Sequence, residues 1–261
     1  MFKKLEMHIK KVLLFPILCM FFLGYGQEKT NMKLIKGGYF VPLYGNDSLV
    51  TKVSDFYLDT YLVTQADYLN FVKQNDKYAK DKIIKLFADA NYLQKWESNL
   101  NPGAEINLKA PVTNVSWYAA KEYCATQGKR LPTIYEWEYA AMASETAKNA
   151  QRDSLFNHKI IASYEKPKTY KKSVGSTYKN YWGVYDMHGL VWEWTSDFNA
   201  VMISGESRKD KDTDKDLFCG SASVNASNLM DYAAFMRYAF RGSIKANYCI
   251  QNLGFRCASS K

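Results

Sequence analysis

Histidine and cysteine are scarce in this chain, which has three histidines and five cysteines among 261 residues. A catalytic zinc site normally takes three protein ligands, and His158 has no partner at metal-ligand spacing. The sequence also lacks an HExxH pair, a CxxC pair, a nucleophile elbow and a glycine-rich phosphate loop. These absences argue against the common hydrolases and nucleotide-dependent enzymes. For His188, they favour the role of a hydrogen-bonded turn residue over that of a metal ligand.

Charge of one sign is not concentrated anywhere, although the formal net charge is +9. Basic residues alternate with acidic ones, as in residues 209–216, which is typical of a solvated loop. A nucleic-acid surface would instead show a basic stripe. We therefore expect no nucleic-acid partner.

A long apolar run is missing too. The longest, Val12–Leu23, has about a dozen residues, whereas a membrane span needs roughly 20. It follows four lysines and precedes Gly24 and Gly26, which together form the parts of a secretory signal peptide. We expect a signal peptide over residues 1–26, no membrane span in the mature chain, and a periplasmic or secreted location. Lipidation of Cys19 is disfavoured because Leu18 before it is not small.

Four cysteines would remain after cleavage: Cys124, Cys219, Cys249 and Cys257. An even number in an oxidising compartment favours disulfides. Four cysteines allow three pairings, and the sequence alone does not choose among them.

Alternating apolar residues predict strands near 32–40 and 53–64. Helices are predicted after Thr64, over 81–92, after Ser116, and after Thr133, where Glu136 completes a capping box. Residues 151–181 are polar and are expected to be a surface excursion, whereas 184–194 and 252–257 are expected to form short strands and turns. The tryptophans of the aromatic segments are expected in the core: Trp137, Trp192 and Trp194. Helices among many short segments indicate an α+β fold.

Four segments carry a family resemblance: Pro111–Cys124, Gly128–Ala141, Gly183–Trp194 and Asn252–Cys257. In this order and at these separations they resemble the formylglycine-generating enzyme, or sulfatase-modifying factor, family. The resemblance implies one such domain over residues 32–259, with a C-type lectin-like fold of low regular secondary structure. It also implies a disulfide between Cys124 and Cys257.

The family's chemistry is a copper-assisted, oxygen-dependent oxidation at two cysteines, which follow a G-G-S phrase by three and eight residues. The matching phrase here ends at Ser221, and those positions hold Val224 and Leu229. Neither side chain can bind copper(I) as a thiolate does. Catalytic residues are therefore unknown, with Cys219 and Cys249 as candidates. A disulfide between these two is favoured, and free thiols that bind copper are the alternative.

Calcium is less expected here than in typical relatives, whose calcium-binding Asn is replaced by Leu190. Asp186 and Glu193 are the remaining weak candidates for calcium ligands, although calcium needs six to eight oxygens. The family's iron-dependent members carry a histidine-rich helical domain, which this sequence lacks. Copper remains a candidate cofactor.

Three arginines near the C-terminal motifs could bind anions: Arg237, Arg241 and Arg256. Guanidinium groups bind carboxylates and phosphates through paired hydrogen bonds. Pairing with acids of the fold, such as Asp186 or Glu193, is an equally weighted alternative.

The segments 87–96 and 181–194 resemble a bacterial branch of the family associated with copper nitrite reductase and denitrification. This implies an accessory or maturation factor for a periplasmic protein partner. Two alternatives remain open. One is a copper- or thiol-dependent oxidoreductase that uses Cys219 and Cys249, and the other is a lectin-like ligand-binding module.

Overall fold

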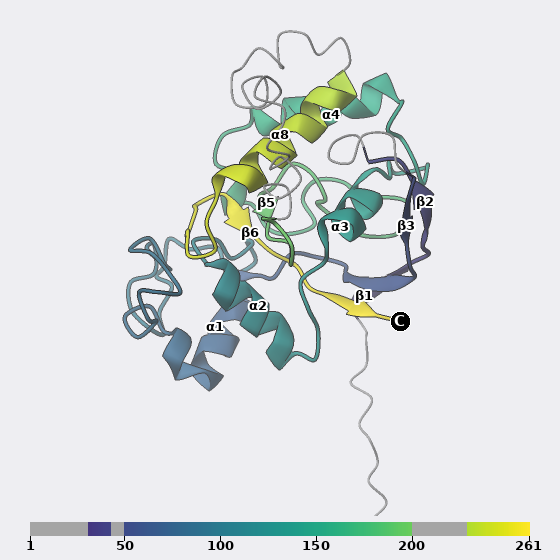
Figure 1. Cartoon of the computed structure of the whole chain (residues 1–261). Helices are drawn as coiled ribbons and strands as arrows, with labels where there is room; N and C mark the ends of the chain where they lie inside the picture. The colour runs from purple at the N-terminus through teal and green to yellow at the C-terminus, as the bar shows by residue number, and fades with distance from the viewer. Residues whose placement is uncertain (1–30, 43–49, 200–228) are drawn as a thin grey trace, which may run out of the picture. The chain divides into compact units, whose positions relative to one another are not determined.

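Three small sheets organise the residues that the computed structural model describes, which are 31–42, 50–199 and 229–261. Strands β1 (Met32–Ile35), β4 (Phe56–Asp59) and β7 (Ala258–Ser260) form an antiparallel sheet with β4 in the middle. The first and last described strands therefore flank the same central strand (Figure 1). A second antiparallel pair joins β2 (Gly38–Phe40) to β3 (Thr51–Val53).

The third sheet pairs β5 (Trp192–Glu193) with β6 (Leu253–Gly254) in parallel. The two strands are short, but they bring the segment around Trp194 onto the C-terminal segment around Phe255. Both of these rings are fully buried. Two of the motif segments that carried the family resemblance thus meet in the core.

Three helices begin where the sequence predicted, at a hydroxyl side chain that accepts the backbone N–H of the first turn. Thr64 and Thr133 each complete a capping box with an acidic residue three positions on. The helices are α1 (Gln65–Gln74), α2 (Trp117–Thr126) and α3 (Ile134–Ala141). The predictions of these helix starts are confirmed.

Two further helices, α4 (Ser154–Tyr164) and α8 (Leu229–Ser243), lie side by side (Figure 1). Residues 151–181 were expected to be an irregular surface segment, and the presence of α4 corrects that expectation. This helix buries only Phe156, Asn157 and Ile160, so its apolar periodicity is too weak to be evident in the sequence. No helix was expected from the sequence where α8 lies.

The helix predicted over residues 81–92 is wrong, because this segment forms consecutive turns. Long-range hydrogen bonds hold its backbone instead: Asp81 N–H donates to the side chain of Asn99, and Asp89 N–H donates to the carbonyl of Asn247. Two of the apolar residues in the expected stripe, Ile84 and Leu86, are exposed. Tertiary hydrogen bonds thus override the local helical pattern. The short 3-10 helices η1 (Asp76–Tyr78) and η2 (Thr169–Lys171) complete the described elements.

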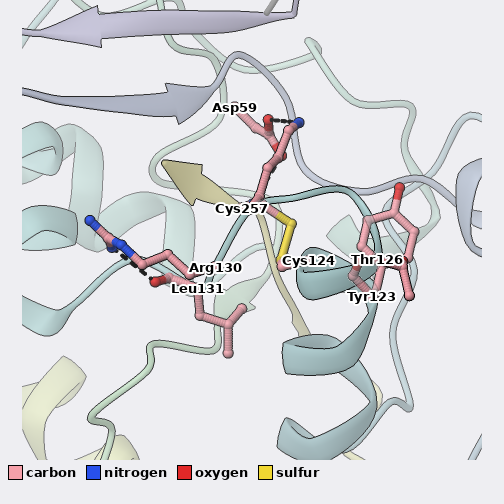
Figure 2. Close-up of a disulfide and its surroundings, with 8 residues drawn as sticks. Asp59, Tyr123, Cys124, Thr126, Arg130, Leu131 and Cys257 are labelled. Atoms are coloured by element: carbon pink, nitrogen blue, oxygen red, sulfur yellow. Dashed lines mark hydrogen bonds and ion pairs between the residues drawn. A yellow bond between two sulfur atoms is a disulfide. The ribbon is translucent and has the colours of Figure 1, made fainter. Parts of the chain in front are cut away.

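A disulfide joins Cys124 on α2 to Cys257 beside β7, across 133 positions of the chain (Figure 2). This is the pair that the family resemblance implied. The backbone N–H of Cys257 donates to the Asp59 carboxylate at 3.0 Å, and the Lys129 Nζ lies 2.7 Å from the same carboxylate. The linkage therefore fixes α2 against the three-stranded sheet.

Candidate functional site

Cys249 is the one candidate catalytic cysteine within the described residues, since Cys219 lies outside them. Its thiol is free and buried. The expected pairing with Cys219 involves a residue outside the described part of the chain and stays a prediction. Burial raises the pKa of the Cys249 thiol well above its ordinary value, and the nearby Asp89 carboxylate raises it further. Because the thiolate is the form that attacks and binds metals, this environment makes Cys249 a poor nucleophile and a poor copper ligand.

A cavity of about 400 Å³ lies between α8, the loop after α4, and the segment leading into β5. Its apolar lining includes Trp192 and Phe240, and its cationic lining includes Arg241, Lys166 and Lys168. Cavities of this size hold small ligands or a few side chains of a partner. Except for Arg241, these residues belonged to no site predicted from the sequence.

Arg237 and Arg241 line one wall of the cavity, and both pair with the buried Glu138 behind it. We call these three residues the Glu138 triad. Arg237 of α8 donates from Nε and Nη2 to the Glu138 carboxylate on α3, at 2.9 and 2.7 Å, and Arg241 Nη1 donates to it at 2.7 Å. Burial alone would raise the pKa of Glu138, but the two guanidinium groups outweigh it and lower that pKa to about 2. The triad therefore carries one excess positive charge.

Arg256 is fully buried and pairs with Glu193 on β5 through Nε at 2.7 Å and Nη2 at 2.9 Å. This corrects the anion-binding prediction for Arg256 and for Arg237. Their guanidinium groups already donate to carboxylates of the protein, Glu193 and Glu138 respectively. Pairing with acids, the alternative prediction, is correct for Glu193 but not for Asp186. The acid that the sequence-based prediction missed is Glu138, which follows Trp137 on α3. The only hint in the sequence was that Arg237 and Arg241 lie four residues apart, which places both guanidinium groups on one face of a helix.

The two carboxylates considered for calcium are both occupied by protein donors. Glu193 accepts from Arg256, while Asp186 accepts from the N–H and hydroxyl of Thr177 at 2.9 and 2.8 Å and from Gly175 N–H. A cation would have to displace these donors. In the described part of the chain, no group of three or more His, Cys, Asp or Glu side chains could hold a metal ion.

An aromatic stack forms a second wall. The Trp192 ring lies between Tyr164 of α4 and Phe240 of α8, with ring centroids 5.0 and 4.7 Å away and nearly parallel planes. Offset stacks of this kind stabilise by more than their buried area alone. Trp137 and Trp194 are buried as expected, whereas Trp192 is only half-buried and lines the cavity.

His188 is a buried turn residue, as the sequence analysis favoured. Its Nε2 lies 3.1 Å from the carbonyl oxygen of Ala141, and its ring packs edge-on against Trp137. Burial, together with the positive charge of Arg237, lowers the pKa of His188 to about 3. The imidazole is therefore neutral at physiological pH and positions the turn.

The fold and the motif segments define the class of protein, and comparison with known proteins confirms it. The chain belongs to the sulfatase-modifying factor enzyme 1-like domain family, whose sequence profile matches residues 25–261. Among relatives, it is 28% identical to the inactive C-alpha-formylglycine-generating enzyme 2 of Bos taurus, covering 91% of this chain and 90% of that protein.

It is also 27% identical to the formylglycine-generating enzyme of Mus musculus, over 79% of this chain and 66% of that protein. The solved structure of CarF shares the fold, with a TM-score of 0.50 and 17% identity over 88% of this chain and 98% of that one. The α+β, formylglycine-generating-enzyme fold class predicted from the sequence is confirmed.

Proposed function

We propose that this protein is an exported member of its family without formylglycine-generating activity. In this proposal it acts as an accessory or maturation factor for a periplasmic protein, in particular a copper enzyme of denitrification. The observation that carries the proposal is the loss of the cysteine pair: no cysteine lies between Cys219 and Cys249, and Val224 and Leu229 occupy the matching positions. Copper(I) chemistry that depends on two thiolates has no ligands there.

Two further observations support this proposal. The Cys249 thiol is buried and its pKa is raised, so it does not replace the lost pair. One relative that spans nearly the whole chain bears the name of an inactive family member. Export is inferred from the segment 1–26, which lies outside the described residues. In the described ranges, no helix is both long and apolar enough to cross a bilayer.

The test is deletion of the gene in its host, followed by measurement of copper content and activity of the periplasmic copper nitrite reductase. We expect both to fall. We expect both to recover with the wild-type chain and equally with the double variant Cys219→Ala/Cys249→Ala, because the proposed role uses no thiol. Intact mass of the exported chain should correspond to a start at Gln27.

Normal copper content in the deletion strain would disprove the maturation role. If the double cysteine variant failed to complement, and purified wild-type protein bound copper(I) stoichiometrically, the thiol-dependent oxidoreductase would be the better assignment.

A further inference from the structure

Positive charge is concentrated around the 400 Å³ cavity. Lys166 and Lys168 line it, are exposed, and form no ion pair within the described part of the chain. The Glu138 triad adds one excess positive charge from the buried side, and Glu193 in the lining is neutralised by Arg256. Charges at a concave, partly desolvated wall act more strongly than on an open surface, so the cavity favours an anion.

Hydrogen-bond donors in the wall are left without acceptors. Arg241 donates only through Nη1 to Glu138, so its Nε and Nη2 find no acceptor among the described residues. A carboxylate bound in the cavity would accept hydrogen bonds from these two groups.

The loop that carries the two lysines is held in place. Lys168 has a left-handed backbone (φ 55°), a conformation that costs a non-glycine residue free energy and persists only where neighbours impose it. The next residue, Thr169, donates its hydroxyl to the carbonyl of Leu190 and so ties the loop to the segment before β5. The lysines are thus presented to the cavity without large rearrangement.

We propose that this cavity binds a carboxylate-rich peptide segment, which on the proposed function belongs to the protein partner. A carboxylate would accept from Nε and Nη2 of Arg241, further acidic side chains would meet Lys166 and Lys168, and apolar parts would pack on the edge of the aromatic stack. The volume suits a few side chains rather than a folded domain.

The test measures binding of a fluorescently labelled tetraglutamate peptide to the full mature chain by anisotropy, against tetraglutamine and tetralysine. We expect tetraglutamate to bind at least tenfold more tightly than either, and to weaken as salt is raised because the attraction is electrostatic. Free glutamate and inorganic phosphate should bind more weakly. Equal binding of tetraglutamine, or tighter binding of phosphate, would overturn the proposal.

Two variants with matched controls locate the site. Lys166→Gln/Lys168→Gln lies on an exposed loop and should weaken tetraglutamate binding roughly tenfold. Lys172→Gln/Lys179→Gln removes the same charge from exposed positions that do not line the cavity, and should leave binding nearly unchanged. Equal loss in both double variants would mean general electrostatic attraction and would refute the site.

The second pair tests the wall. Arg241→Lys keeps a positive charge beside Glu138 but removes the two spare donors, and should weaken tetraglutamate binding roughly tenfold. Arg130→Lys makes the same change at an arginine that pairs with Glu136 away from the cavity, and should have no effect. If tetraglutamate fails to bind while gene deletion still lowers reductase copper, this proposal falls and the accessory function stands.

Discussion

At the scale of single residues, burial decides what the titratable groups of this protein can do. The same physical effect raises the pKa of Cys249 and lowers the pKa of His188, because in both cases the charged form loses its hydration. The Cys249 thiol therefore stays protonated at neutral pH, while the His188 ring stays neutral and is held by burial and by its Nε2 contact with the carbonyl of Ala141. A thiol and an imidazole that look chemically active in the sequence are structural in the folded chain.

His188 should make stability depend on pH. Its folded pKa of about 3 lies below the ordinary value of 6.5, so its stabilising contribution is complete above pH 6.5 and is lost as pH falls toward 3. Acidification from pH 6.5 to 5 should cost about 2 kcal/mol of unfolding free energy from this residue. Urea unfolding of the wild type and of His188→Gln, which keeps a donor for Ala141, should show a flatter pH dependence in the variant.

His158→Gln is the matched control. His158 is exposed on α4, so this variant should show the same pH dependence of stability as the wild type. Identical slopes for the wild type and His188→Gln would contradict the assignment of a buried neutral imidazole.

At the scale of elements, the Glu138 triad links helices that are distant in sequence. α3 supplies the carboxylate and α8 supplies both guanidinium groups from positions four residues apart on one face. Tyr164 of α4 joins them through its stack on Trp192, which in turn stacks on Phe240 of α8. The cavity wall exists only when these three helices are assembled.

Glu138→Gln should destabilise the protein by about 3–5 kcal/mol, because it leaves two buried guanidinium groups without a counter-ion. Glu145→Gln is the control: its partner Lys159 is exposed, and loss of that surface pair should cost no more than about 1 kcal/mol. Thermal or urea unfolding measures both. A loss below about 1 kcal/mol for Glu138→Gln would show that the triad is open to water.

At the scale of the whole molecule, the Cys124–Cys257 disulfide closes a loop of 133 positions. The loop-entropy model gives about 5 kcal/mol for a loop of this length, and measured values are typically about 2–4. We expect Cys124→Ala/Cys257→Ala to lower the unfolding free energy by about 2–4 kcal/mol. Added reductant should destabilise the wild type but not the variant.

Cys249→Ala provides the comparison for this experiment. Because Cys249 is a free thiol, this variant should keep the full sensitivity of the wild type to reductant. An effect of reductant on Cys124→Ala/Cys257→Ala as large as on the wild type would mean that another disulfide dominates stability.

Short-range patterns let the sequence determine a definite part of this protein. The caps at Thr64, Ser116 and Thr133 fixed three helix starts, because a hydroxyl and the backbone amides of the first turn are neighbours in any context. The resemblance of the motif segments to the family also predicted the fold class and the Cys124–Cys257 disulfide. The absence of the cysteine pair is equally a property of the sequence, and it alone argues against the family's oxidation chemistry.

Tertiary structure decided the rest, because the deciding partners are far apart in the chain. Residues 81–92 have helical periodicity, yet distant backbone and amide groups take their hydrogen bonds. Arg237 looked free to bind an anion until Glu138, 99 positions away, was found beside it. The cavity itself has no local signal, since its lysines, aromatic stack and triad come from separate segments that meet only through packing of the core.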